Sequence, residues 1–142
     1  MLYTELTRKT MRIAFEAHKD QVDKSGIPYI FHPIHLAEQM MDETTVCVAL
    51  LHDVVEDTAI TFERLEEEGF PEAVVAALQL LTHEDAVPYM DYIRRLRENP
   101  VAVAVKLADL RHNSDLTRLD YVDDAARERA KKYAEAIRIL SE

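Results

Sequence analysis

The chain places one histidine and three carboxylates at the end of its most apolar segment. Residues 46–51 (VCVALL) are all hydrophobic, His52 and Asp53 follow directly, and Glu56 and Asp57 come one helical turn later. A segment this apolar is expected to be buried, where an unpaired charge costs on the order of several kcal/mol. These polar groups therefore need compensation, and a bound metal ion is the leading candidate.

The composition predicts one compact helical domain. The 142 residues suffice for one hydrophobic core and are too few for two domains of typical length. Hydrophobic residues make up 48% of the chain, which has only two glycines and no tryptophan, and this suits packed helices better than a sheet or a disordered chain. We expect a single all-α domain over residues 1–142, a multi-helix bundle around a central buried helix at about 46–57.

Charge and cysteine content exclude several classes of function. Asp and Glu outnumber Lys and Arg by 27 to 17, which argues against binding to a nucleic-acid polymer. Cys47 is the only cysteine, the first residues lack the pattern of a signal peptide, and no apolar stretch reaches the roughly 20 residues of a membrane span. We expect a cytoplasmic protein that acts on a small molecule, without nucleic-acid or membrane partners. The sequence leaves formation of a homo-oligomer open.

Prolines and capping residues divide the chain into helices. A loop is expected at 20–33, which combines turn formers with proline, and a short helix is expected to begin after Pro33. The alternating valines in 101–107 would also suit a strand, but the Asn99-Pro100 cap and the lack of a partner strand favour a helix there. The other helices are expected at about 4–18, 44–57, 61–65, 71–81, 88–98, 100–113 and 123–140.

The spacing along the predicted central helix brings its polar groups together. His52 and Glu56 lie four residues apart on one face, and Asp53 and Asp57 repeat this relation about 100° around the helix. Imidazole and carboxylate ligands suit a divalent first-row metal, and Mn²⁺, Fe²⁺ and Zn²⁺ are all chemically admissible. Neighbouring ligands from one segment cannot complete a site, so further ligands must come from elsewhere in the chain.

His32 and Asp109 are the natural additional ligands. His32 lies at the start of a helix after a proline-containing loop, and Asp109 is an acid within an apolar helix. The alternative is that His52 and Asp53 form a hydrogen-bonded pair in the core, which is the better interpretation of such a doublet in isolation. The second acidic pair, together with His32 and Asp109, favours the metal site.

Three motifs together resemble the HD superfamily of metal-dependent phosphohydrolases. They are His32-Pro33, the block 52–57 (HDVVED) and the segment 106–113 (KLADLRHN). The resemblance is specifically to the hydrolase domain of the RelA/SpoT family and its stand-alone relatives, which remove pyrophosphate from the 3′ position of guanosine tetra- and pentaphosphate. It covers most of the chain, over 17–113, and we expect no room for a synthetase domain.

The resemblance implies a fold of packed helices around one Mn²⁺ ion. The implied metal ligands are His32, His52, Asp53 and Asp109. Such a set leaves room at an octahedral ion for a water molecule and a phosphate oxygen. The metal can then lower the pKa of that water and polarise the phosphorus.

The resemblance also implies that Glu56 and Asp57 activate or orient the attacking water. Glu56 would accept a proton from the water or pass it to the leaving group, with Asp57 as its partner. Asn113 lies where the family uses an amide near the nucleotide, and Lys106 is either a phosphate-neutralising residue or a surface lysine. Of the remaining histidines, His18 and His112 are interpreted as core or supporting residues. His35 and His83 are interpreted as surface residues.

Two positions depart from the family's pattern. In the family, the loop before Gly-x-Pro-Tyr carries a basic residue that stacks on guanine, whereas the corresponding position here is Asp23, with Lys24 beside it as the candidate substrate-binding cation. A basic residue also tends to occur within two positions after Asn113, where this chain has Ser114 and Asp115. An acid cannot supply cationic stacking and repels a polyphosphate unless it faces away.

The function that fits these observations is hydrolysis of a nucleotide or another small phosphorylated metabolite by metal-activated water. Guanosine 3′,5′-bis(diphosphate) is the expected substrate. One alternative is a catalytically silent domain that keeps its metal and serves as a nucleotide-binding or interaction module. Another is an HD hydrolase of non-guanine nucleotides.

Overall fold

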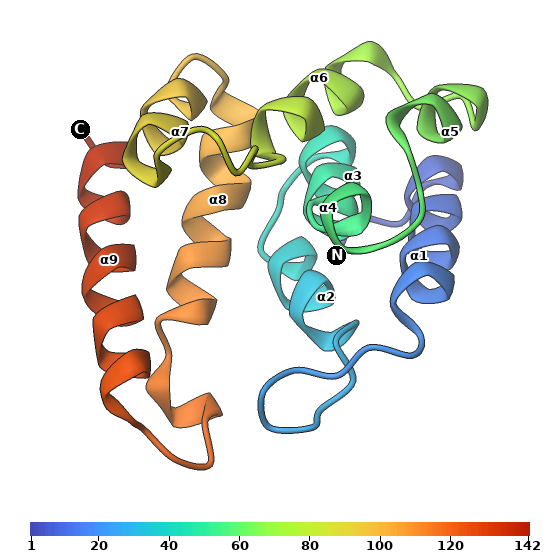
Figure 1. The fold of residues 1–142 in the computed structure, drawn as a ribbon. Coiled ribbons are helices and arrows are strands. Elements are labelled where there is room, and N and C mark those ends of the chain that lie inside the picture. The colour runs from blue at the N-terminus through green and yellow to red at the C-terminus, as the bar shows by residue number, and fades with distance from the viewer.

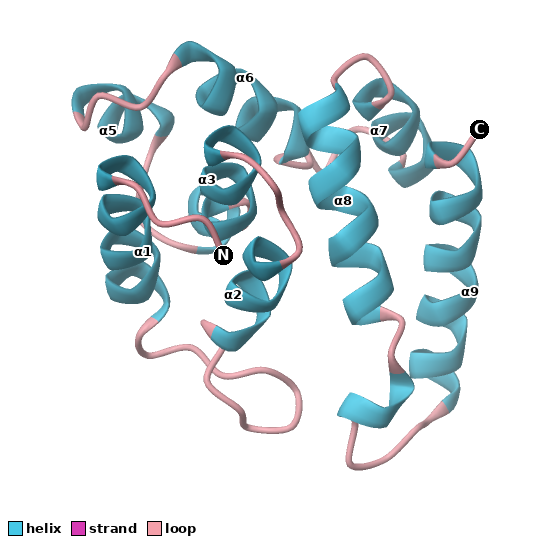
Figure 2. Ribbon diagram, turned by 180° about the vertical axis from the view of Figure 1, so that it is seen from behind, coloured by secondary structure: helices cyan, strands magenta, loops and turns pink.

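The computed structural model describes all 142 residues and consists of helices without a strand (Figure 2). One isolated antiparallel bridge pairs Val22 with Pro28 in the loop between the first two helices. The expected all-α fold class is therefore confirmed. The helices are α1 (Glu5–His18), α2 (Phe31–Glu38), α3 (Glu43–Leu51), α4 (Val54–Asp57), α5 (Phe62–Glu67), α6 (Glu72–Leu81), α7 (Tyr89–Leu96), α8 (Pro100–Asn113), the 3₁₀ helix η1 (Leu116–Arg118) and α9 (Asp124–Leu140).

Side-chain caps fix where many of these helices begin. The Thr4 hydroxyl accepts a hydrogen bond from the backbone N–H of Thr7, and the Thr7 hydroxyl accepts one from the N–H of Thr4, which makes a capping box. Each such cap satisfies an N–H that the helix itself leaves unpaired. The other α-helices with a side-chain cap begin after Asp42, Thr61, Asn99 and Asp123.

The buried helix α3 lies at the centre of the fold. Its residues from Thr45 to Leu51 are all buried, and it packs against α1, α2, α6 and α8 (Figure 1). On the other side, α8 packs against α9. Because α2, α3 and α8 also contact one another in pairs, the three segments that carry the polar motifs meet beside the core. None of the helices has the length and apolar character needed to cross a membrane.

The central helix is not continuous, so the prediction of one helix over 46–57 is wrong. α3 ends at Leu51, and Asp53 has φ −108° and ψ 0°, in the sparsely populated region where many active-site residues lie. Only the single turn of α4 follows. A continuous helix would point His52 and Asp53 about 100° apart. The break instead brings His52 Nε2 to 3.0 Å from Asp53 Oδ2.

The start of α2 also differs from the prediction. The helix begins at Phe31 rather than after Pro33, and Pro33 occupies its first turn, where the missing N–H removes no helical hydrogen bond. His32 therefore belongs to the helix and not to the loop before it. The remaining helices agree with the predicted ranges to within two residues at each end.

Candidate metal centre

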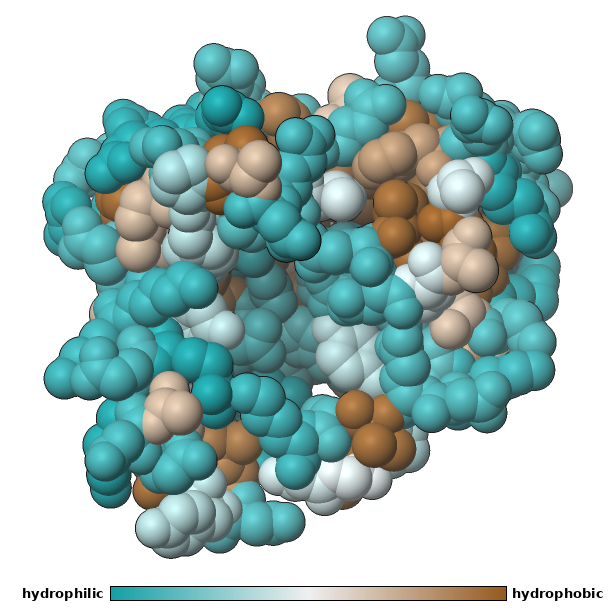
Figure 3. All heavy atoms as spheres, viewed as in Figure 1, coloured by the Kyte–Doolittle hydropathy of each residue, from teal (hydrophilic) through white to brown (hydrophobic).

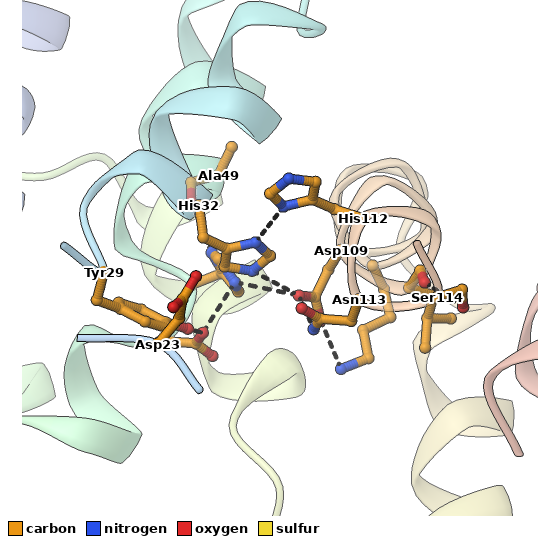
Figure 4. A network of polar contacts seen from close by, with 12 residues as sticks. Asp23, Tyr29, His32, Ala49, Asp109, His112, Asn113 and Ser114 are labelled. Carbon is orange, nitrogen blue, oxygen red and sulfur yellow. Dashed lines mark hydrogen bonds and ion pairs between the residues drawn. The ribbon is translucent and has the colours of Figure 1, made fainter. Parts of the chain in front are cut away.

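Three helical segments bring buried histidine and aspartate side chains to one point. His32 comes from the first turn of α2, His52 follows the last turn of α3, and Asp109 lies on α8. All three are buried, and one potential ligand atom from each lies within 4.8 Å of the others. Figure 4 shows His32 and Asp109 pointing toward each other between their helices. Segments far apart in sequence thus form one cluster of donors.

The distances within the cluster bring together all four ligands expected from the sequence. His32 Nε2 is 2.9 Å from Asp109 Oδ1, and His52 Nε2 is 3.5 Å from the same oxygen. Asp53 Oδ2 completes the set at 3.0 Å from His52 Nε2. Two imidazole nitrogens and two carboxylates that converge in this way match the mixed nitrogen and oxygen donor set of a divalent first-row metal.

The environment of His52 tests whether a metal ion fits. His52 Nδ1 donates to the carbonyl oxygen of Ala49 at 2.7 Å, so Nε2 is left as the free acceptor of the neutral ring. Nε2 is buried and makes no hydrogen bond of good geometry. Burial lowers the pKa of His52, but the Asp53 and Asp109 carboxylates outweigh burial and raise this pKa to well above its ordinary value. A positive charge is therefore favoured at Nε2, as a proton or as a metal ion.

His32 is held by a second histidine. His32 Nδ1 lies 2.7 Å from His112 Nδ1, and the two rings are stacked with centroids 5.0 Å apart. Burial, followed by the Arg118 charge, lowers the pKa of His112 to about 4, so His112 is neutral at neutral pH. One of the two Nδ1 atoms must donate to the other, and donation from His32 leaves its Nε2 free for a metal. His112 is thus a supporting residue, while the exposed His35 stacks on its outer side.

Asp109 is the most heavily partnered residue of the centre. Lys106 Nζ lies 3.0 Å from Asp109 Oδ2, and Asn113 Nδ2 donates to Asp109 Oδ1 at 3.0 Å. Burial raises the pKa of Asp109, but Lys106 and then the two histidines lower it, to well below its usual range. Asp109 is therefore an anion. Because the Lys106 side chain is only 15% exposed, it is not the surface lysine that one reading of the sequence allowed.

Tyr29 is a member of the site that the sequence reasoning did not select. Its hydroxyl donates a short hydrogen bond to Asp53 Oδ2. Burial, together with the Asp53 charge, raises the pKa of Tyr29, so the phenol stays protonated and keeps the hydrogen that it donates to Asp53. Burial raises the pKa of Asp53 as well, but His52 and Tyr29 lower it to about 2. The sequence signal that could have identified Tyr29 is its position after Pro28, in the Gly-x-Pro-Tyr motif.

Beside the cluster, Asp53 shares a second group of carboxylates with Glu56 and Asp57. Oxygen atoms of the three lie within 4.8 Å of one another, and Glu56 and Asp57 are exposed. The pKa of Glu56 is raised, first by partial burial of its carboxyl group and then by the Asp53 and Asp57 charges. The pKa of Asp57 is raised by partial burial of its carboxyl group and then by the Asp53 charge. Two acids with raised pKa values therefore border the metal ligands on the open side.

His83 corrects one expectation, because it is not an independent surface residue. Its backbone N–H donates to Glu56 Oε1 at 2.9 Å, and its ring stacks on Tyr92 with centroids 4.6 Å apart. The loop between α6 and α7 thereby folds back onto α4. His83, Glu56 and Lys106 line a cavity of about 110 Å³ that also reaches His52 and Asp109.

A larger cavity, of about 330 Å³, opens on the other side of His32. Its walls come from the loop before α2, the end of α8, η1 and the first half of α9, and Figure 3 shows the surface hollowed on this face. Lys24 and Asn113, the expected substrate-binding residues, line it, whereas Lys106 lines the smaller cavity. Arg118 and Arg129 also line the larger cavity and were not foreseen.

The two acids that depart from the family's pattern have local structural roles. Asp23 Oδ1 accepts hydrogen bonds from the backbone N–H groups of Ser25 and Ile27, at 2.8 and 3.0 Å, and closes the turn before α2. Asp115 Oδ1 accepts from the N–H and the hydroxyl of Thr117 and so caps η1. Both carboxylates are therefore partly compensated by N–H donors of their own loops.

Residues 10–140 match the HD domain family. The chain is 35% identical over 119 residues to the guanosine-3′,5′-bis(diphosphate) 3′-pyrophosphohydrolase of Aquifex aeolicus, an alignment that covers 75% of this chain and 17% of that protein. It is 32% identical over 121 residues to the bifunctional (p)ppGpp synthase/hydrolase SpoT of Escherichia coli, with the same coverage of both chains. The alignments thus span less than a fifth of the length of these relatives.

A solved structure agrees with these alignments. The fold superimposes on a protein described as a metazoan orthologue of SpoT that hydrolyzes ppGpp, with a TM-score of 0.78 and 25% identity. The match covers 99% of this chain and 88% of that one. Since the family's sequence profile covers nearly the whole chain and a solved relative shares its fold, this protein belongs to the HD domain family.

Proposed function

We propose that this chain is a divalent-metal-dependent phosphohydrolase that removes pyrophosphate from the 3′ position of guanosine 3′,5′-bis(diphosphate). The observation that carries the proposal is the convergence of His32, His52, Asp53 and Asp109, with Glu56 beside them. The activities named for the Aquifex and Escherichia relatives and for the metazoan structure support the substrate. The proposed unit is one HD-type domain over residues 1–142.

His32, His52, Asp53 and Asp109 would hold the metal, for which Mn²⁺ is the proposed identity. Oxygen and imidazole donors in equal number suit Mn²⁺ well, whereas no thiolate is present to favour a softer ion. When bound, the ion supplies a lowered pKa of a ligated water and polarisation of the phosphorus. Hydrogen bonds hold the ligand side chains in place: Asp53 accepts from Tyr29, His52 donates to the carbonyl oxygen of Ala49, and Asp109 accepts from Lys106 and Asn113.

Glu56 is the proposed general base. The N–H of His83 fixes one of its carboxylate oxygens and leaves the other free to accept a proton from water. A raised pKa brings Glu56 nearer to neutrality, where a general base is more effective. Asp57, which lies next to it with a raised pKa, would keep the transferred proton on the pair until it reaches the leaving group.

Cations and amides in the two cavities would bind the substrate. Lys106 lines the small cavity next to Glu56, where its ammonium group can neutralise phosphate oxygens. Lys24 and Asn113 line the larger cavity, whose volume of about 330 Å³ suits a nucleoside. The reacting phosphate would therefore lie between the two cavities, at the metal ligands.

The direct test is to measure phosphate and pyrophosphate release from a panel of nucleotides in the presence of Mn²⁺. The proposal requires turnover of guanosine 3′,5′-bis(diphosphate) with pyrophosphate as a product. Turnover with equal efficiency on adenine and guanine nucleotides would instead support a hydrolase without base preference. Nucleotide binding without turnover, in protein shown to contain metal, would support a silent binding module.

A second test concerns the metal and does not depend on activity. Asp53→Ala is expected to lower both the metal content and the melting temperature of the metal-loaded protein, because ligand binding to the folded state adds to stability. Asp85→Ala, which changes an exposed aspartate in the loop between α6 and α7, is the matched control. Full metal content in Asp53→Ala by elemental analysis would contradict the proposed ligand set.

A further inference from the structure

The larger cavity gathers positive charge on a protein whose net charge is −10. Lys24, Arg118 and Arg129 line it, together with the acids Asp23 and Asp115. Both acids accept hydrogen bonds from the backbone N–H groups of their own loops, which offsets part of their negative charge. Lys24 and Arg129 form no ion pair, and Arg118 has only a long one with Asp23, at 3.7 Å, so this wall of the cavity suits an anion.

Arg118 is the most firmly placed of these cations. Its Nη1 donates to the carbonyl oxygen of His112 at 2.9 Å and lies 3.4 Å from Asn113 Oδ1. Its Nη2 has only a long contact, 3.7 Å from Asp23 Oδ2. The guanidinium group is thus anchored at one nitrogen, while N–H donors at the other stay available to a ligand in the cavity.

The backbone of Arg118 is tied to the facing loop and its side chain to the metal centre. Ser25 Oγ donates to the Arg118 carbonyl oxygen at 2.9 Å, which joins η1 to the loop before α2 across the cavity. Asn113, beside the guanidinium group, donates to Asp109. A group bound at Arg118 is therefore held in a defined position relative to the metal ligands.

We infer that Arg118 is a specificity-determining residue that binds the phosphate groups of the substrate that are not cleaved. This inference rests on the proposed function, in which one diphosphate is attached at the 3′ position of the ribose and one at the 5′ position, and only the 3′ one reacts. A guanidinium group presents two parallel N–H donors that match phosphate oxygens, and an anchored one loses little freedom on binding. Arg118 thereby supplies a cation from η1, whereas the loop on the facing side of the cavity carries Asp23 at the position where the family has a basic residue.

The kinetic test compares two substrates that share guanosine 3′-diphosphate but carry either a 5′-diphosphate or a 5′-hydroxyl group. Arg118→Ala is expected to raise KM for the 5′-diphosphate substrate about tenfold, as loss of a charge-assisted hydrogen bond predicts, with kcat nearly unchanged. KM for the 5′-hydroxyl substrate should change less than about twofold. Equal effects on both substrates, or no effect on either, would overturn the inference.

Two further variants separate binding from folding. Arg127→Ala removes an exposed arginine of α9 that pairs with Asp124 outside the cavity, and should leave both KM values unchanged. Arg118→Lys keeps the charge without the fork of donors and should recover part of the selectivity for the 5′-diphosphate substrate. If Arg118→Ala does not fold, Arg118→Lys carries the test, and wild-type selectivity in that variant would count against bidentate phosphate binding.

Calorimetry without turnover distinguishes failure of this inference from failure of the proposed function. Guanosine 5′-diphosphate should bind the wild-type protein about tenfold more tightly than Arg118→Ala, whereas guanosine should bind both equally. If this difference is found but no nucleotide is hydrolysed, Arg118 binds phosphate and the proposed function is wrong. If guanosine 3′,5′-bis(diphosphate) is hydrolysed but the difference is absent, the proposed function stands and the inference about Arg118 fails.

Discussion

The metal centre and the larger cavity beside it are built in different ways. The centre draws its residues from α3 and from helices that pack against it. Three of its four proposed ligands are buried, and the fourth, Asp53, is half-buried and accepts a hydrogen bond from Tyr29. The cavity takes much of its wall from two loops and η1, with many half-buried or exposed residues. The difference suggests that the reactive chemistry is fixed by core packing, whereas recognition can change with little cost to the fold.

The largest effect is expected where the centre and the core coincide, at Asp109. Asp109→Ala leaves the largely buried Lys106 ammonium, whose side chain is 15% exposed, without its partner and removes a metal ligand. We expect the free energy of unfolding of the metal-free protein to fall by about 3–5 kcal/mol, the usual cost of breaking a buried ion pair on one side. Urea denaturation with added chelator measures this loss.

Asp109→Asn is the matched control for that variant. Its amide oxygen can still accept from Lys106, so the loss of stability should be clearly smaller, while metal binding and activity are lost in both variants. If Asp109→Ala were as stable as the wild-type protein without metal, the centre would not depend on core packing, and the contrast with the cavity would disappear.

Glu56 separates chemistry from stability within the centre. Glu56→Gln is expected to lower kcat by about 10²- to 10⁴-fold, the usual contribution of a general base. The folded-state pKa of Glu56 lies above its ordinary value of 4.5. Between pH 4.5 and this raised pKa, the folded state holds the proton of Glu56 more tightly than the unfolded state does, so the stability from this group is lost as the pH rises through that range. The glutamine variant should therefore melt no lower than the wild-type protein at pH 7.

Glu63→Gln, an exposed change on α5, is the control for both readouts and should alter neither. A Glu56→Gln variant that retains activity would remove Glu56 from the role of base and leave Asp57 as the remaining candidate.

Most of the fold could be predicted from the sequence because its signals are local. Asn99-Pro100, Thr61 and the prolines at 71 and 88 mark helix starts within a few residues of themselves, and the structure places the helices there. The break at His52-Asp53 could not be predicted in this way. It depends on Tyr29 and Asp109, which approach from other segments and hold the two side chains on one side of the backbone.

The residues of the candidate site divide in the same way. His52, Asp53 and Asp109 stand out in the sequence because polar residues interrupt apolar helices. Lys24 and Asn113 came from the family resemblance. His83 and Arg118 carry no such signal. His83 acts through its backbone N–H, which every residue except proline has, and Arg118 donates to a backbone carbonyl, which every residue has.

His83 provides a test of intermediate size. His83→Pro removes the N–H that donates to Glu56, and the preceding Thr82 already has φ −79° and ψ 113°, a conformation that a following proline accepts. Because this hydrogen bond favours the ionised carboxylate, its loss should raise the pKa of Glu56 further. The acid limb of the kcat profile should then move to higher pH.

In the wild-type protein, partial burial raises the pKa of Glu56 most, and the His83 hydrogen bond lowers it. The charges that act on it besides are Asp53 and Asp57, which raise the pKa, and Lys106, which lowers it. His83→Ala keeps the N–H and loses only the ring stacked on Tyr92, so its profile should match that of the wild-type protein. An equal shift in both variants would assign the effect to the ring and not to the backbone hydrogen bond.

The smallest effect is expected on the cavity side, at Ser25. Ser25→Ala removes the hydrogen bond to the Arg118 carbonyl, a half-buried contact whose loss should cost about 0.5–1 kcal/mol and lower the melting temperature by about 1–4 °C. Ser114→Ala, which removes a hydroxyl that donates to the carbonyl oxygen of Leu110 at the end of α8, is the control. If the cavity wall tolerates change as its construction suggests, Ser25→Ala raises KM for the 5′-diphosphate substrate and leaves kcat and metal content unaltered. A matching fall in kcat would mean that the loop and the metal centre are coupled, so that recognition could not vary independently of the chemistry.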